Sequence, residues 1–185
     1  MIRPIYLYGS EVLRKVAEPA DLSKKEEIRQ LVADLWETLA ASEGCGLAAP
    51  QIGESVRVVV VGGDVMEDVY PYLKGFKRTF INPTVLEASD EKITYNEGCL
   101  SVPGVYCDVV RSKSIKVEYY NEKFEKTVEV FDNFAARMVE HEFSHLDGVL
   151  FTDLVAPIRR KLVAKKLSGI AAGKTHTRYK SKLAK

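Results

Sequence analysis

The chain has 185 residues, of which 46% are hydrophobic, and its formal net charge is +1. This size and composition suit a single globular domain that buries a core without a disulfide framework. The first ten residues lack the basic region and apolar run of a signal peptide, and no stretch approaches membrane-spanning length. Because the three cysteines are an odd number as well, we expect a cytoplasmic protein with reduced thiols and no membrane association.

The first predicted helix begins near residue 23. Ser23 and Glu26 have the spacing of a capping box, and apolar residues then recur with helical period as far as residue 39. This helix is predicted to run to about Ser42 and to stop at Gly44. The following segment, GCGLAAPQIG, is predicted to be a glycine-rich loop from which the amide of Gln51 can point into a cleft.

Strands are predicted through the middle of the chain, with a polar, turn-rich loop between the first two. The strand-like runs are residues 56–61, 80–86, 93–95, 115–119 and 128–130. Apolar and polar residues alternate in the last two runs, which predicts a hairpin. A turn is predicted at Pro103-Gly104, and a C-terminal helix begins at Pro157 with Ile158, Leu162 and Leu167 facing inward. Because the strands run mostly in hairpin order, we expect an α+β domain.

The most specific motif lies between residues 132 and 148. The sequence HEFSH at 141–145 has the HExxH pattern, and side chains four residues apart share one face of a helix. Both imidazoles can therefore bind one metal ion, while Glu142 can reach a water molecule beside it. Phe134 and Met138 continue the stripe of the histidines, which predicts that this face points into the interior.

The third metal ligand is not where the familiar zinc peptidases have it. A phenylalanine occupies the position of the third metzincin histidine, and no glutamate follows His145. Asp153 and His176 are candidates downstream, but Cys99, next to a glycine, is the better one. A thiolate with two imidazoles leaves a fourth position open, as a catalytic metal site requires. The other two cysteines are interpreted as structural thiols.

Three segments, in this order and at these separations, resemble the signature motifs of the peptide deformylases. They are GCGLAAPQIG at 44–53, EGCLS at 97–101 and HEFSH at 141–145. The resemblance implies an α+β fold with antiparallel or mixed sheets packed around a central HExxH helix, and with an N-terminal and a C-terminal helix. It also implies a metal-dependent hydrolase that removes the formyl group from formylmethionine at the N-terminus of nascent polypeptides and releases formate.

The resemblance also implies roles for individual residues. Three of them would hold the metal ion: Cys99, His141 and His145. Glu142 would move the proton, and the Gln51 amide and the Leu100 backbone N–H would stabilise the oxyanion. The peptide would lie extended along four consecutive residues, Gly44, Cys45, Gly46 and Leu47. The methionine pocket would be lined by Phe134, Arg137 and Met138.

The third motif departs from the family pattern HExDH, because Ser144 replaces the aspartate. That aspartate supports the ligands without touching the metal, so the change bears on ligand orientation and metal retention. Glu97 and Arg111 are expected to pair and to brace the cysteine segment. One divalent ion is expected, with Fe2+ as the native metal by resemblance and Zn2+, Ni2+ or Co2+ in the isolated protein.

The end of the chain is basic. From Arg159 onward there are ten Lys and Arg residues and no acid. Because the whole chain has a net charge of +1, the preceding 158 residues carry a net charge of −9. Residues 1–173 are predicted to form one catalytic domain and residues 174–185 a basic, flexible tail. Removal of the chain after Gly173 is expected to leave hydrolysis of short peptides intact. The tail suits an acidic surface such as ribosomal RNA, or is simply a solvated end.

Two other functions fit parts of the sequence. A metallopeptidase that cuts ordinary peptide bonds shares the HExxH motif but lacks the downstream ligand. A non-catalytic, metal-stabilised module that binds the ribosome through its basic tail would leave Glu142 without a purpose. For a deformylase, the expected partners are N-formylmethionyl peptides, with the ribosome as a second partner.

Overall fold

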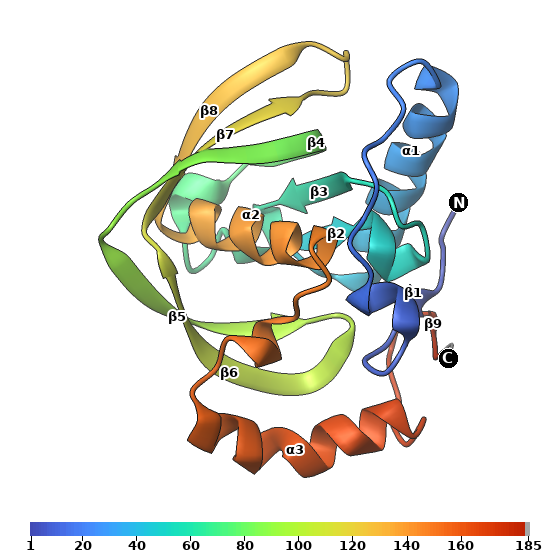
Figure 1. Cartoon of the computed structure of the whole chain (residues 1–185), viewed down its shortest axis with the longest axis vertical. Coiled ribbons are helices and arrows are strands. Elements are labelled where there is room, and N and C mark those ends of the chain that lie inside the picture. The colour runs from blue at the N-terminus through green and yellow to red at the C-terminus, as the bar shows by residue number, and fades with distance from the viewer. Residues whose placement is uncertain (184–185) are drawn as a thin grey trace.

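The computed structural model describes residues 1–183 and places one helix between two β layers (Figure 1). This helix, α2, spans Asn133–Leu146 and carries the HExxH residues. On one side it packs against a five-stranded sheet, and on the other it contacts a two-stranded ribbon. The last two residues of the predicted tail, 184 and 185, lie outside the described residues.

The five-stranded sheet is antiparallel throughout and has the order β2-β3-β4-β7-β8. Its strands are β2 (Gly46–Ala48), β3 (Val58–Gly62), β4 (Lys77–Ala88), β7 (Ser114–Tyr120) and β8 (Lys126–Asp132). The ribbon is inserted between β4 and β7 and consists of β5 (Lys92–Cys99) and β6 (Val102–Ser112). A parallel pair joins β1 (Ile5–Tyr6) to β9 (Ser181–Lys182). The predicted α+β class with mixed strand pairing is therefore confirmed, and so is the β7–β8 hairpin.

Two further helices cover the outside of these layers. Helix α1 spans Lys25–Ser42 and packs against β2 and β3, while α3 spans Pro157–Ala171 and packs against β6. Short 3-10 turns complete the chain at Glu11–Arg14, Ala49–Ile52, Asp64–Met66, Pro71–Leu73 and Phe151–Asp153. Among residues 1–183, none of the helices combines the length and the apolar character needed to cross a membrane.

Helix α2 is the most buried helix, because apolar side chains surround it on both layers. The predicted stripe of Phe134, Met138, His141 and His145 is buried along its length. Phe80 of β4 makes an edge-on contact with Phe143 at 5.2 Å between ring centroids, which packs the helix onto the sheet. The burial places the two histidines away from bulk water.

The capping box predicted at the start of α1 does not form, although the helix begins within two residues of Ser23. The Ser23 hydroxyl donates to Asp21 Oδ1 at 2.7 Å, and the helix begins at Lys25 without a side-chain cap. The aspartate two residues upstream competes for this serine, because it closes a local turn of its own. The end agrees with the prediction, since the helix stops at Ser42 and Glu43 takes a left-handed conformation with φ 56°.

The predicted inward face of α3 is correct for Leu167 but wrong for Ile158 and Leu162. Ile158 is 66% exposed and Leu162 is 69% exposed, whereas Leu167 and Ile170 are buried. Residues 158 and 167 are nine positions apart, or two and a half turns, so they lie on opposite sides of the helix. Only the side that carries Leu167 meets β6, and the other side faces solvent.

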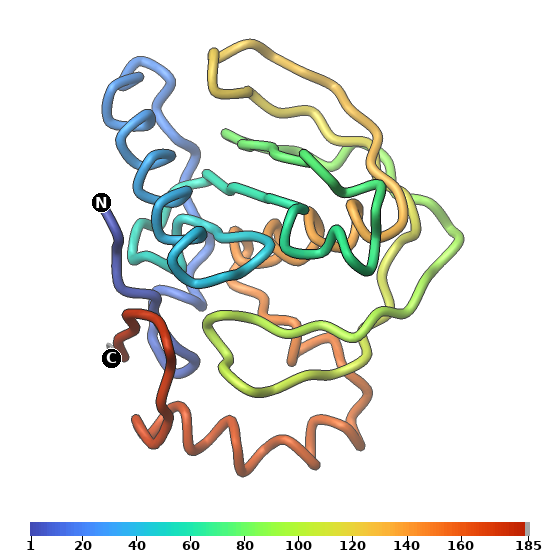
Figure 2. Tube along the Cα trace, turned by 180° about the vertical axis from the view of Figure 1, so that it is seen from behind, coloured from blue at the N-terminus to red at the C-terminus, as the bar shows by residue number. Residues whose placement is uncertain are grey.

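Two predictions about connecting segments differ from the structure. The turn between β5 and β6 lies at residues 100–101, and Pro103 and Gly104 belong to β6. The predicted flexible tail instead lies against the domain through residue 183, since its residues 181–182 pair with β1. Figure 2 shows the C-terminal segment, in red, passing beside the N-terminal segment, in dark blue.

Candidate metal centre

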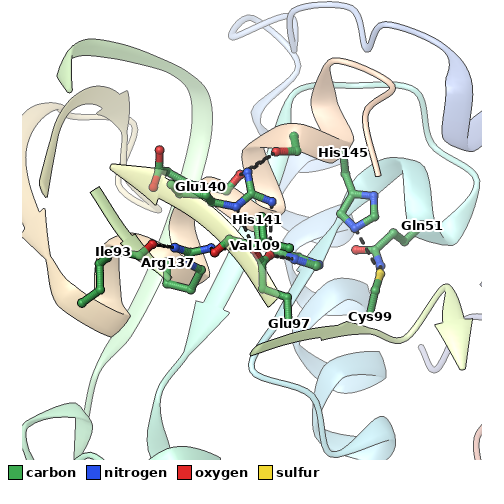
Figure 3. Close-up of polar contacts among 11 residues, drawn as sticks. Gln51, Ile93, Glu97, Cys99, Val109, Arg137, Glu140, His141 and His145 are labelled. Carbon is green, nitrogen blue, oxygen red and sulfur yellow. Dashed lines mark hydrogen bonds and ion pairs between the residues drawn. The ribbon is translucent and has the colours of Figure 1, made fainter. Parts of the chain in front are cut away.

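The structure brings the three predicted ligands together from two elements. Cys99 ends β5, and His141 and His145 occupy successive turns of α2. One ligand atom from each lies within 4.8 Å of the others, and Cys99 Sγ is 3.3 Å from His145 Nε2 (Figure 3). One sulfur and two imidazole nitrogens form a donor set that suits a divalent transition metal and leaves a position free.

The downstream candidates for the third ligand are not part of this group. Asp153 pairs with Arg14 and Arg160, so its carboxylate is engaged on the surface. His176 lines the neighbouring cleft but is not among the three residues whose ligand atoms converge. The geometry therefore favours Cys99.

Two buried polar atoms at this centre have no hydrogen-bond partner within the described part of the chain. They are Glu142 Oε2 and His145 Nδ1. Burial raises the pKa of the Glu142 carboxyl to about 7 in the metal-free protein, although His141 partly opposes the shift. Burial next to His141 lowers the pKa of the His145 ring, which keeps this imidazole neutral, as a metal ligand must be. The residues therefore fit a bound cation.

The Glu97 carboxylate organises the other side of the centre (Figure 3). It accepts a hydrogen bond from His141 Nδ1 at 2.6 Å and others from Arg111 Nε at 3.0 Å and Arg137 Nη1 at 2.7 Å. Burial alone would raise the pKa of Glu97, but the hydrogen bonds from His141 and Arg111 outweigh it and hold this pKa well below its usual range. The bond to Nδ1 fixes the His141 ring and leaves Nε2 for a metal.

Arg137 has a contact role that sequence reasoning missed. It borders the cleft, but it is 2% exposed and its guanidinium is bound to the Glu97 carboxylate and to backbone oxygens of the ribbon. Besides Glu97 it donates to the backbone oxygens of Val109 at 2.8 Å and Ile93 at 2.6 Å, and so ties α2 to the ribbon. Its position four residues before His141, on the same helix face, is the signal that could have indicated this role.

Ser144 takes the place that the family pattern gives to an acid. Its hydroxyl accepts a hydrogen bond from Arg111 Nη1 at 2.8 Å and donates to the Glu140 backbone oxygen at 2.9 Å. The position therefore still contacts Arg111, as a neutral group. The ion pair found for this arginine among the described residues is the one with Glu97.

Gln51 lies beside the cysteine, on the 3-10 turn that follows β2. It is 1% exposed, and its Nε2 donates to Ser101 Oγ at 3.1 Å and lies 3.6 Å from Cys99 Sγ. Its Oε1 accepts the Ala48 backbone N–H at 2.8 Å, which fixes the orientation of the amide. The donor end of the amide therefore faces the metal centre.

A cleft of about 750 Å³ opens over these residues. It is lined by several predicted substrate contacts, namely Gly44, Cys45, Gly46, Phe134 and Met138. Leu47 is an exception, because its side chain is fully buried in the core beneath α1. Residues 176–179 also line the cleft, although the sequence had placed them in a loose tail.

The comparisons with known proteins agree with this geometry. Residues 2–161 match the family model described as polypeptide deformylase. The chain belongs to this family. It is similar to the peptide deformylase of Flavobacterium johnsoniae, with 41% identity over 100% of this chain and 97% of the relative. It is also similar to that of Pseudothermotoga lettingae, with 44% identity over 97% of this chain and 98% of the relative.

The fold agrees with a solved deformylase structure as well. A crystal structure of peptide deformylase from Plasmodium falciparum superimposes with a TM-score of 0.82 and 30% identity, covering 94% of this chain and 99% of that one. Polypeptide deformylases are metal-dependent hydrolases that remove the N-formyl group from nascent peptides, and the chain is an enzyme of this kind.

Gly46 provides a test of how closely β2 approaches the Glu142 carboxylate. A β-carbon on this residue would lie 2.5 Å from Glu142 Oε1, so Gly46→Ala must displace Glu142. A misplacement of about 1 Å can cost about 10²-fold in rate, and we expect a loss of kcat of that order in a formate-release assay.

Gly169→Ala is the control, because a β-carbon there meets nothing within 4 Å. It should keep full activity and gain about 0.5–1 kcal/mol of stability, so equal kcat losses in both variants would contradict the steric argument.

Proposed function

We propose that Cys99, His141 and His145 hold one divalent ion and that Glu142 is the general base of deformylation. The observation that carries the proposal is that the three ligand atoms converge within 4.8 Å of one another. They lie at a cleft that Glu142 also lines, and Glu142 Oε2 is buried without a hydrogen-bond partner among residues 1–183. A bound ion would supply Lewis acidity and lower the pKa of water.

Glu142 is suited to move the proton in both directions. Glu142 lines the same cleft as Cys99 and His141, so its carboxylate can accept a proton from the attacking water and return it to the departing amine. Its buried Oε2 has no hydrogen-bond partner among the described residues, so the carboxylate is not held by another group through this atom. Gly46 permits the close approach of β2 that keeps this carboxylate covered.

The oxyanion is proposed to form next to the turn that follows Cys99. The Gln51 amide points toward this turn and is oriented by Ala48. The backbone N–H of Leu100 is the second proposed donor, on a residue that lines the cleft. Two fixed donors beside the metal would stabilise the negative oxygen without reorganisation during the reaction.

The substrate is proposed to bind as an added strand. β2 is an edge strand of the five-stranded sheet, and residues 44–46 line the cleft, so an extended peptide can pair with this backbone. Phe134 and Met138 give the cleft an apolar wall on α2, which suits a methionine side chain. Specificity for formylmethionine would come from this wall together with the metal centre.

The native metal is proposed to be Fe2+, with Zn2+, Ni2+ or Co2+ acquired during isolation. The chain should lose formate release from formyl-Met-Ala-Ser when its metal is removed with a chelator. Anaerobic reloading with Fe2+ should restore a faster rate than Zn2+, and exposure to air should abolish the gain. A Zn2+ enzyme as fast as the Fe2+ enzyme would contradict the iron assignment.

The same assay tests the rival metallopeptidase function. An unformylated Met-Ala-Ser peptide should remain intact with every metal, because the proposed reaction is the hydrolysis of a formamide. Cys99→Ala is the matched control and should not regain formate release on reloading. Cleavage of the unformylated peptide would overturn the proposed reaction.

The remaining proposals concern location and partners. A cytoplasmic location is proposed from the nascent-chain substrate. Residues 1–173 contain every residue proposed to hold the metal, move the proton or stabilise the oxyanion, while residues 176–179 complete the lining of the cleft. The solvent-facing side of α3 carries Ile158 and Leu162 amid basic residues, and this surface is proposed to meet the ribosome.

A further inference from the structure

The turn after Cys99 is held by three segments that are distant in the sequence. The Tyr8 backbone N–H donates to the Ser101 oxygen at 2.7 Å. Gln51 Nε2 donates to Ser101 Oγ at 3.1 Å, and the Tyr179 hydroxyl donates to the Leu100 backbone oxygen at 2.5 Å. A turn of two residues thus receives hydrogen bonds from both ends of the chain as well as from the glycine-rich segment.

The β1–β9 pair brings the chain ends to this turn. The Ile5 N–H donates to the Lys180 oxygen and the Leu7 N–H to the Lys182 oxygen, both at 2.9 Å. Figures 1 and 2 show the C-terminal segment returning from α3 to lie beside the N-terminal strand. Tyr179 therefore reaches the turn that follows Cys99 from a part of the sequence that carries none of the signature motifs.

We infer that Tyr179 is a positioning residue for deformylation, acting through Leu100. This inference rests on the proposed role of the Leu100 N–H as an oxyanion donor. The hydrogen bond to the Leu100 carbonyl holds the peptide plane that follows this residue. The N–H belongs to the plane before it, which is shared with Cys99 at the end of β5. Holding the following plane therefore limits rotation at Leu100 between the two planes and restrains the direction of its N–H. The half-buried Tyr179 ring packs against the core cluster of α1 and β3, which holds the hydroxyl in place.

The tail does not depend on this hydroxyl for its own structure. Thr177 Oγ1 donates to the Tyr179 backbone oxygen at 2.8 Å and lies 2.7 Å from Ser181 Oγ. The backbone bonds between β1 and β9 add further support. Removal of the hydroxyl alone should therefore loosen the turn at Leu100 while the tail stays docked.

This role reverses the expectation that residues after Gly173 are dispensable for short peptides. Such a truncation removes Tyr179 and β9 together, so the turn would lose its contact from the C-terminal end of the chain. The substrate cleft would also lose the wall formed by residues 176–179.

The test is Tyr179→Phe in the full-length, metal-loaded enzyme, assayed with formyl-Met-Ala-Ser. We expect kcat to fall about fivefold, the value of one typical hydrogen bond, while KM changes by less than about twofold. The affinity for the product Met-Ala-Ser, measured by calorimetry, and the metal content should stay at the parental values. These readouts separate an effect on the transition state from a loss of substrate binding or of metal.

The matched control is Tyr6→Phe, which removes a hydroxyl from the strand that pairs with β9 and should leave kcat unchanged. An unaltered kcat in Tyr179→Phe would overturn the inference. An equal loss in Tyr6→Phe, or a loss that follows the metal content or the unfolding temperature, would overturn it as well. Failure of the metal and base assignments would appear instead in Cys99→Ala and Glu142→Ala, so the two results are distinguishable.

Discussion

Glu142→Ala is expected to retain its metal and to lose about 10²–10⁴-fold in kcat, the usual contribution of a general acid–base residue. The side chain is buried on α2, and its Oε2 has no hydrogen-bond partner among the described residues. Its removal therefore breaks no hydrogen bond through Oε2 to the described residues, while the proton acceptor is lost. Formate release and metal content, measured on the same preparation, test both parts of this expectation.

Two glutamine variants sharpen the experiment. Glu142→Gln keeps the shape of the side chain but cannot accept the proton, so it should be nearly as inactive as the alanine variant. Glu140→Gln alters a carboxylate two residues away on the same helix that does not line the cleft. Its kcat should stay within a few-fold of the parent. Substantial turnover in both Glu142 variants would show that another group takes the proton.

The regular elements were predictable because their signals are local. The alternation of apolar residues indicated the strands of the β7–β8 hairpin, and the helical period indicated α1 and α2. The burial of Phe134 and Met138 with the two histidines followed from one stripe on one helix. Periodicity did not fix the inward face of α3, because Ile158 and Leu167 are spaced by two and a half turns and only tertiary contacts decide which one is buried.

The metal centre was predictable for a different reason. HExxH places two imidazoles on one helix face by spacing alone, whereas Cys99 required the elimination of downstream ligands and the resemblance of the three motifs. The contacts of Arg137 and Tyr179 could not be obtained in this way. Each depends on a backbone oxygen of a remote segment, Val109 in one case and Leu100 in the other, and backbone acceptors have no sequence signature.

Glu97→Ala is expected to be the most destabilising single change at the site. It removes the carboxylate that pairs with Arg111 and Arg137, whose side chains are 7% and 2% exposed, and that also accepts a hydrogen bond from His141. Loss of one partner from a buried ion pair typically costs about 3–5 kcal/mol, because the remaining charge stays buried without compensation. Urea unfolding at neutral pH should show a loss of this size, and metal affinity should fall as His141 loses its orienting partner.

Glu129→Gln is the matched control for Glu97, because Glu129 also pairs with an arginine, Arg78, but does so on a partly exposed part of β8. Exposed pairs contribute about 0–1 kcal/mol, so this variant should lose little stability and no metal affinity. Glu97→Gln keeps the side-chain volume and should fall between the two. If Glu97→Ala were no less stable than Glu129→Gln, the two arginines would be compensated by groups other than Glu97. The ribbon that carries Cys99 would then be attached to α2 mainly by the backbone bonds of Arg137, and its position over the histidines would not depend on the carboxylate.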